Sequence, residues 1–442
     1  MNSTAKISRS AVLYIAWPII ISNLSTPLLG LVDTAVIGNL GDPALIGAIA
    51  VGAMIFSFLF WGFGFLRMGT TGLVAQANGA GDTAEVKATF YRATLLAGII
   101  AFALLLVQKP LASAAFSLIE GSEAVESAAL TYFSVRIWGA PFSLLHLAVL
   151  GYLLGQGKST LILWLQLLLN GTNIALDIVF VVFLGWEIAG IAAATLIAEI
   201  VAALFGLYLV IRHMNATYGS SASKWVQLKD IPALLRMLSV NRDIMIRTLC
   251  LIFAFAWFTN EGAKSGDILL ATNAILMQFV SFSAFFLDGY ALAAESLIGT
   301  AVGARNPVQY SLTLRYICEL GFANSLILSA FFFFIGPFVI DLLTNVPEVR
   351  EACRVYLIWA VAAPVISLWC YLLDGVFIGA TCTREMRNAM IFSLLAYLAG
   401  WYLLRAPFAN HGLWLSLHVY FVARAASLAC YLPNVRRQAE PV

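Results

Sequence analysis

The chain of 442 residues contains few charged side chains, which make up 11% of the sequence. Soluble domains contain about 25% charged residues. Hydrophobic residues make up 61% of the chain. This composition excludes an ordinary soluble protein and indicates an integral membrane protein. The formal net charge of +2 is too small to indicate a nucleic-acid partner.

Cysteine and histidine are scarce and scattered. The six Cys form no C-x-x-C motif and do not cluster with the four His, which argues against a disulfide framework or a zinc site. We expect no cofactor. No grouping of nucleophile, base and acid indicates a catalytic triad, so no enzyme is expected. Lys6 and Arg9 precede an apolar run that is too long for a signal peptide and predicts an uncleaved first span.

Long apolar runs are plentiful, and a membrane-spanning helix needs about 20 apolar residues. Twelve stretches meet this requirement, which predicts an all-α membrane protein. Their approximate limits are 11–38, 44–75, 89–107, 128–155, 160–184, 188–211, 244–262, 268–303, 316–343, 355–380, 388–408 and 411–433. The polar and then amphipathic stretch after the sixth run predicts a cytoplasmic linker. We therefore expect an N-lobe over 1–211, a linker over 212–243 and a C-lobe over 244–442.

The distribution of basic residues predicts the orientation of these spans. If the N-terminus is cytoplasmic, most of the 25 Lys and Arg residues fall on cytoplasmic connections. Short cytoplasmic loops carry such an excess in membrane proteins. Both termini are therefore expected on the cytoplasmic side.

The two halves of the chain resemble each other at a constant offset of 224 residues. Matched glycine pairs are Gly79/Gly303, Gly151/Gly375 and Gly155/Gly379. Each half holds six spans, an even number, so both halves enter the membrane from the same side. The offset predicts a parallel repeat with a pseudo-twofold axis along the membrane normal, as in transporters with a central site.

Several polar residues lie inside predicted spans. Asp33 lies in the first span, and Asn173 and Asp177 share a face of the fifth because they are four residues apart. Thr195 lies at a similar depth in the sixth span. A carboxylate in lipid is costly, so these groups are expected to face a cavity where protons or Na⁺ bind, or else to form a static hydrogen-bonded cluster. Pro18 predicts a bend in the first span, either fixed or a hinge.

The second half contains its own intramembrane acids. Asp288 and Asp374 each precede a glycine and are candidates for a second cation or substrate site, although a structural hydrogen bond explains Asp374 equally well. Arg67 lies at nearly the repeat-equivalent depth of Asp288. It is a candidate for a cytoplasmic gate with Asp288 or Glu295. Pairing within its own lobe or snorkelling to the interface is the alternative.

Four stretches together resemble the multidrug and toxic compound extrusion (MATE) transporters, in particular their DinF-like bacterial branch. They are "PLLGLVDTAVIGNLG" (27–41), "FLRMGTTGLVAQANGAGD" (65–82), "NRDIMIR" (241–247) and "YLLDGVFIGATCTREMRNAM" (371–390). The resemblance covers essentially the whole chain. It implies a two-lobe fold of twelve helices that exports hydrophobic, often cationic, compounds in exchange for H⁺ or Na⁺.

The resemblance also implies roles for individual residues. Asp33 matches the family's first-helix aspartate, whose protonation is proposed to bend the helix at the proline matched by Pro18 and to release the drug. The residues that match the family's N-lobe cation site are Asn173, Asp177 and Thr195. Asp374 matches the helix-ten acid of the sodium-coupled NorM-like branch. We favour H⁺ coupling through the N-lobe, with Na⁺ at Asp33, Asn173 and Asp177 as the alternative.

A lipid flippase, a membrane enzyme and a passive channel are the alternative functions for such a chain. A flippase of a lipid-linked precursor needs a basic cavity, and the buried bases that can be placed (Arg67, Arg136, Arg424) are outnumbered by acids. A membrane enzyme needs clustered catalytic groups, and a passive channel does not explain duplicated lobes. We expect a monomeric antiporter of the bacterial inner membrane that exports small hydrophobic or cationic compounds.

Overall fold

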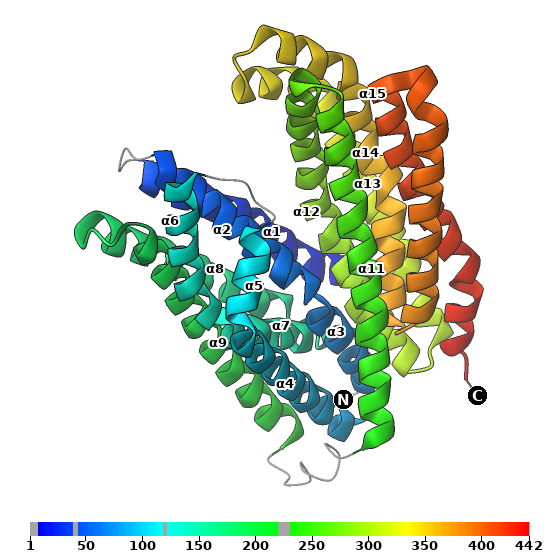
Figure 1. Ribbon diagram of the computed structural model, residues 1–442. Coiled ribbons are helices and arrows are strands. Elements are labelled where there is room, and N and C mark those ends of the chain that lie inside the picture. The colour runs from blue at the N-terminus through cyan, green and yellow to red at the C-terminus, as the bar shows by residue number, and fades with distance from the viewer. Residues whose placement is uncertain (1–7, 39–42, 118–121, 220–229, 442) are drawn as a thin grey trace. The chain divides into compact units, whose positions relative to one another are not determined.

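The computed structural model (Figure 1) describes residues 8–38, 43–117, 122–219 and 230–441. Some side chains of the first helix and of the start of the second, that of Asp33 among them, lie outside the described part. Within the described ranges every regular element is a helix, so the all-α prediction is confirmed.

The described elements follow one another along the chain as α-helices with one short 3₁₀ segment (η1) and one π segment (η2). They are α1 (Arg9–Gly38), α2 (Pro43–Gly62), α3 (Phe65–Gly79), α4 (Thr83–Leu106), α5 (Gln108–Phe116), α6 (Glu123–Arg136), η1 (Ile137–Gly139), α7 (Ala140–Gly155), α8 (Ser159–Asp177), η2 (Ile178–Phe183), α9 (Glu187–Tyr218), α11 (Ile231–Lys264), α12 (Asp267–Gly303), α13 (Pro307–Leu343), α14 (Pro347–Gly379) and α15 (Thr383–Gln438).

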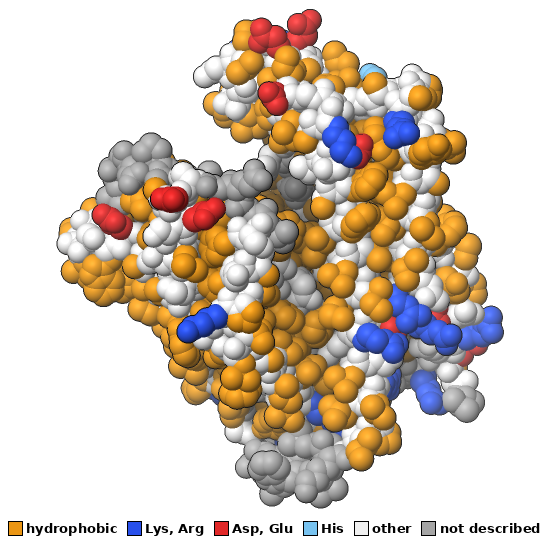
Figure 2. Space-filling view, viewed as in Figure 1, with side chains coloured by type: hydrophobic (Ala, Val, Ile, Leu, Met, Phe, Trp, Pro, Cys, Tyr) orange, Lys and Arg blue, Asp and Glu red, His pale blue; other side chains and the backbone are white. Residues whose placement is uncertain are grey.

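The twelve predicted spans are confirmed. Ten helical stretches of the described residues are long and apolar enough to cross a membrane. The 30-residue helix α1 is a further long apolar helix. The stretch α15 contains two spans, because its backbone breaks at Ala409 (φ 46°, ψ −124°). Hydrophobic side chains cover much of the visible surface in Figure 2, as expected for helices in contact with lipid.

Two helices reach into the segment expected to be a linker. Helix α9 continues to Tyr218, and α11 already begins at Ile231. The amphipathic stretch "IPALLRMLSV" therefore forms the first turns of α11 rather than a separate surface segment. Residues 220–229 lie outside the described part of the chain.

The chain divides into two compact units. Unit 1 comprises Met1–Ile20, Asn78–Gly81 and Ser239–Val442, and unit 2 comprises Ile21–Ala77 and Asp82–Leu238. Three helices, α1, α3 and α11, therefore belong partly to each unit.

The internal repeat is visible in close helix contacts inside each unit. In unit 2, a Cβ atom added to Gly151 of α7 would lie 2.6 Å from the carbonyl oxygen of Arg67 in α3. In unit 1, a Cβ atom added to Gly375 of α14 would lie 2.1 Å from the carbonyl oxygen of Ala291 in α12. Both members of this second pair lie 224 residues after those of the first.

The next turn of the same helices repeats the arrangement. An added Cβ atom would lie 2.9 Å from the Thr71 carbonyl oxygen at Gly155, and 2.5 Å from the Glu295 carbonyl oxygen at Gly379. Thr71 and Glu295 are again 224 residues apart. Since only glycine lets two helix backbones approach this closely, the matched glycines have the same packing role in both units.

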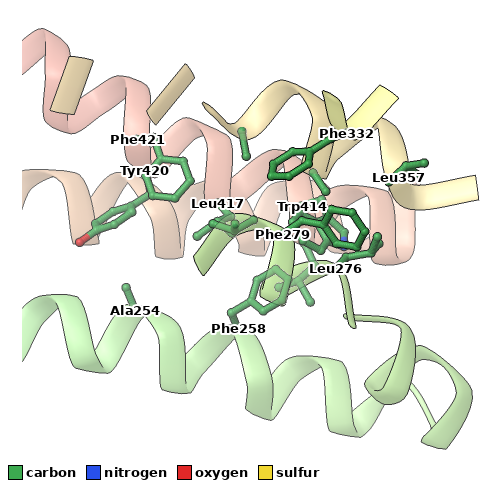
Figure 3. Packing of buried hydrophobic residues seen from close by; sticks show 14 of the residues in the cluster. Ala254, Phe258, Leu276, Phe279, Phe332, Leu357, Trp414, Leu417, Tyr420 and Phe421 are labelled. Carbon is green, nitrogen blue, oxygen red and sulfur yellow. The ribbon is translucent and has the colours of Figure 1, made fainter. Parts of the chain in front are cut away.

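The core of unit 1 is rich in aromatic residues (Figure 3). Phe258 of α11 lies edge-on to Trp414 of α15, with 5.1 Å between the ring centroids. Asn273 of α12 exchanges two hydrogen bonds with Asn410 (2.8 and 3.0 Å) and accepts one from Trp414 Nε1 (2.9 Å). This buried amide pair lies next to the backbone break at Ala409 and attaches it to α12.

Candidate functional site

A row of polar side chains follows one face of α8 in unit 2. Gln166, Asn170, Asn173 and Asp177 are spaced by four, three and four residues, so they share one helix face. Asn170, Asn173 and Asp177 are 6%, 0% and 0% exposed. The structure thus places the predicted pair of Asn173 and Asp177 inside unit 2, as part of a longer row.

Asn173 lies between Asp177 and Thr195, and one orientation of its amide satisfies both of its ends. With Nδ2 toward the acid, Asn173 donates to Asp177 Oδ2 (3.0 Å) and accepts from Thr195 N and Oγ1 (3.2 and 3.0 Å). Turned by half a rotation, Nδ2 can donate to Thr195 Oγ1 (3.0 Å), but the amide oxygen then faces the Asp177 carboxyl group, which can donate to it only when protonated. Thr195 also donates to the Ile191 carbonyl within α9 (3.0 Å).

The same row connects α8 to α1. Asn170 Nδ2 donates to Ser25 Oγ (2.8 Å), and Asn170 Oδ1 accepts from Gln166 Nε2 (3.0 Å). Ser25 donates onward to the Ser22 carbonyl of its own helix (2.6 Å). Asn170 and Ser25 are not among the site residues predicted from the sequence. The spacing along α8 could have identified Asn170, because it lies four residues after Gln166 and three residues before Asn173.

The helix that carries Asp177 changes its winding directly after that residue. Helix α8 ends at Asp177, and residues Ile178–Phe183 form a π-helix. Short π segments are rare and are found mostly at functional sites. The wider turn sets the direction in which the chain leaves the polar row.

Pro18 lies within α1, close to the division between the two units, which falls between Ile20 and Ile21. A Cβ atom added to Gly289 of α12 would lie 2.4 Å from Ile20 Cγ1. The first turns of α1 therefore pack closely on α12 in unit 1, whereas Ser25 bonds to α8 in unit 2. The side chain of Asp33 lies outside the described part of α1.

In unit 1, Asp374 of α14 is bound by two guanidinium groups. Arg247 donates from both Nε (2.9 Å to Oδ2) and a terminal nitrogen, and Arg424 donates from Nε (3.3 Å to Oδ1) and a terminal nitrogen. All three side chains are more than nine-tenths buried. The Arg424 guanidinium also lies 6.0 Å from the centre of the Tyr371 ring.

A second buried ion pair lies in unit 2. Arg136 donates to both carboxylate oxygens of Glu199, one at 2.7 Å. The guanidinium lies over the rings of Phe56 and Phe60, 5.2 and 5.5 Å from their centres. An added Cβ atom on Gly139 would lie 2.6 Å from Glu199 Oε2, so glycine is needed beside the pair.

Comparison with known proteins decides the family. The family model described as MatE matches residues 18–179 and 244–403, one stretch in each half of the chain. The chain belongs to the MatE family, the MATE transporters. These are membrane transporters and not enzymes, so the expectations of a multi-pass transporter and of no catalytic site are confirmed.

Named relatives agree with this assignment. The chain is 40% identical to DNA damage-inducible protein F of Escherichia coli over 96% of this chain and 91% of that protein. It is 24% identical to a probable multidrug resistance protein NorM of Acinetobacter baylyi, over 96% and 94% of the two chains. A solved MOP superfamily transporter of Pyrococcus furiosus superimposes with a TM-score of 0.86 at 19% identity, over 98% and 97% of the chains.

The remaining predicted site residues of this MATE transporter are placed by the structure in separate helices. Arg67 lies in α3 of unit 2, and Asp288 and Glu295 lie in α12 of unit 1. Glu295 is buried. The predicted gate between them stays a prediction. Among the described residues, no group of three or more His, Cys, Asp or Glu side chains is arranged to hold a metal ion.

Proposed function

We propose that this MATE transporter is an H⁺-coupled multidrug antiporter that exports hydrophobic or cationic compounds by alternating access. It resides in the bacterial inner membrane with both termini in the cytoplasm. The coupling residues are Asp33, Asn173, Asp177 and Thr195. The observation that carries the proposal is the amide of Asn173, held between Asp177 and Thr195.

An amide can hydrogen-bond to a carboxyl group in both of its protonation states, because the amide has a donor end and an acceptor end. Its NH₂ end donates to a charged Asp177, and its oxygen accepts from a protonated Asp177 after half a rotation. Thr195, whose hydroxyl can donate and accept, supports both arrangements. The Asn173 amide can therefore pair with Asp177 in either protonation state of the carboxyl group.

The carboxylate of unit 1 is held differently. Arg247 and Arg424 can only donate, so a protonated Asp374 would leave buried N–H groups without an acceptor. Two positive charges also oppose binding of a further cation. We therefore leave Asp374 out of the coupling site and interpret it as a structural acid. The proposal keeps coupling in unit 2.

Coupling to the substrate requires that protonation moves a helix. The described contacts of α1 support a hinge at Pro18: the turns around Pro18 pack on α12, while Ser25 bonds to Asn170 in the polar row of α8. Proline removes a backbone hydrogen bond and so lowers the cost of bending there. In the proposal, protonation of Asp33 and Asp177 changes this row and bends α1.

The test is efflux of ethidium from proteoliposomes under an imposed pH gradient without Na⁺. The wild type is compared with Asp33→Asn and Asp177→Asn. The matched control is Asp341→Asn, which changes an exposed acid that pairs with Arg354 outside the row. We expect pH-driven efflux in the wild type and the control, and its loss in both test variants.

Two results would overturn the coupling scheme. Efflux that requires Na⁺ would make the protein a sodium-coupled exporter. Efflux that persists in Asp177→Asn would remove the polar row from the mechanism. Crystals grown at low and high pH test the hinge directly, since an α1 of the same shape in both would contradict bending at Pro18.

One observation favours a second candidate, the transport of an anionic lipid-linked compound. Two buried bases, Arg247 and Arg424, both bind the single acid Asp374. The transporter of Pyrococcus furiosus is described as having a binding pocket of reverse polarity that suggests a different function. Competition of an anionic amphiphile with ethidium in the same assay distinguishes the candidates, because only the second predicts that the anion is transported.

A further inference from the structure

A deep apolar groove runs between α13, α14 and the second span of α15, and all its lining residues belong to unit 1. Its volume is about 560 Å³, inside the range of about 300–1,000 Å³ typical of ligand pockets. Its lining includes Leu314, Cys318, Trp369, Leu372, Val422 and Ala429. Trp369 and Val422 are 40% and 54% exposed, so the groove opens at the surface of the unit.

A basic residue continues the wall of this groove on α15. The lining residues Val422, Ala425, Ala429 and Leu432 are spaced by three, four and three residues, and Arg436 follows four residues later. Residues at these spacings share one helix face. Arg436 therefore lies on the groove face, one turn or about 6 Å beyond Leu432.

A buried hydroxyl lies at the same end. On α13 the lining residues Cys318 and Leu314 are followed, one turn toward the start of the helix, by Tyr310. Leu314 and Cys318 line the same groove as Ala429 and Leu432 of α15. The first turns of α13 and the last turns of α15 therefore meet at one end of the groove.

Of these two polar groups, only Arg436 is open to a ligand. Tyr310 is 2% exposed and its hydroxyl has no hydrogen-bond partner in the described part of the chain. Arg436 is exposed, and the described residues supply no carboxylate for its guanidinium. Lys and Arg side chains gather at the end of unit 1 that carries the C-terminus (Figure 2). The groove thus joins an apolar channel to a positively charged, hydrogen-bonding end.

We propose that this groove binds an anionic phospholipid, with an acyl chain along the lining residues and its phosphate on Arg436. An arginine fork matches phosphate oxygens well, and basic pockets between transmembrane helices bind lipid head groups. A hydrophobic cation, the expected cargo, would be repelled by Arg436. The site is separate from the polar row of unit 2 and does not depend on the coupling ion.

Native mass spectrometry of the purified full chain tests this site, after exchange into micelles that contain phosphatidylglycerol or phosphatidylcholine. The test variants are Arg436→Gln, which removes the charge, and Ala429→Trp, which fills the groove. Arg437→Gln and Cys430→Trp are matched controls, since both change exposed neighbours on α15 that do not line the groove.

We expect the wild type and both controls to retain phosphatidylglycerol. Each test variant should bind it about tenfold more weakly, the usual effect of losing a charge-assisted contact. Arg436→Gln changes an exposed side chain, so the variant remains folded and its result is interpretable on its own. Equal retention of phosphatidylcholine by the wild type would overturn the assignment. So would unchanged retention in Arg436→Gln, or displacement of the bound lipid by ethidium.

Discussion

The two units share a scaffold but place their buried polar groups at different positions. The residues 224 positions after Asn173 and Asp177 are Tyr397 and Trp401. Tyr397 is fully buried in the aromatic core of unit 1, and Trp401 packs against it. Where unit 2 has an amide and a carboxyl group that can exchange a proton, unit 1 has packed rings.

The reverse comparison gives the same result. The residues of unit 2 that correspond to Asp374 and Arg424 are Leu150 and Ile200. The close-approach glycines, in contrast, are kept in both units. The repeat therefore determines helix packing, and each half has its own polar chemistry. Function has to be argued from these sites rather than from the shared fold.

Helix continuity differs between the units as well. Phe63 and Gly64 separate α2 from α3 in unit 2, whereas α12 runs unbroken through the corresponding positions of unit 1. The π segment η2 also lies in unit 2. Both interruptions thus occur in the unit that holds the polar row of α8, whereas the break at Ala409 lies in unit 1.

The largest expected effect is on stability, from Asp374→Asn. It removes the carboxylate that both Arg247 and Arg424 bind, and breaking a buried ion pair in this way costs about 3–5 kcal/mol. We expect a large fall in thermal stability and little folded protein. The measurement is thermal unfolding in detergent followed by size-exclusion chromatography.

The companion variant Arg424→Met separates charge balance from packing. It leaves one guanidinium for one carboxylate, so we expect a clearly smaller loss of stability than in Asp374→Asn. A loss as large as that of Asp374→Asn would contradict the interpretation of Asp374 as the acid that neutralises two bases.

The next largest effect tests what the units share. Gly375→Ala and Gly151→Ala each place a Cβ atom against a carbonyl oxygen of the neighbouring helix, at 2.1 and 2.6 Å. Overpacking of this kind costs about 1–3 kcal/mol. We expect both variants to be destabilised, Gly375→Ala more strongly. The measurement is thermal unfolding of the two variants side by side. A loss of stability in only one of them would contradict the same packing role of the two glycines.

The sequence predicted most of the fold because hydrophobic length and the repeat offset are local or periodic signals. It located the twelve spans, and the break at Ala409 falls between the last two predicted runs. It missed that α11 begins at Ile231, because an amphipathic stretch can either lie on a membrane surface or continue a helix. Only packing distinguishes these alternatives.

The candidate site was predictable only where its residues share one helix. Asn173 and Asp177 follow from a four-residue spacing. The partners of Asp374 do not, because Arg247 and Arg424 come from helices far apart in the chain. Arg247 lies near the start of the predicted span 244–262, whereas α11 already begins at Ile231 and Arg247 is buried.

A smaller effect on stability is expected from Asp177→Asn. The new amide can still bond to Asn173, so stability should change by no more than about 1 kcal/mol, the usual net value of one hydrogen bond. Efflux driven by a pH gradient should nevertheless be lost. Thermal unfolding and efflux should be measured on the same preparation. In Asp374→Asn, by comparison, we expect stability and efflux to be lost together. A large loss of stability in Asp177→Asn would make this acid structural too.

The smallest effect concerns the link between α1 and α8. Ser25→Ala removes the hydroxyl that accepts from Asn170 Nδ2 at 2.8 Å, and hydrogen bonds between membrane helices contribute about 0.6 kcal/mol on average. Thermal unfolding should therefore shift only slightly. If α1 transmits protonation from the polar row, efflux in Ser25→Ala should fall by more than its small loss of stability predicts. Asn170→Leu should reduce efflux to the same extent. The double variant should then lose no more efflux than either single variant. Additive losses of efflux would mean that the two residues act independently and that the link does not carry the coupling.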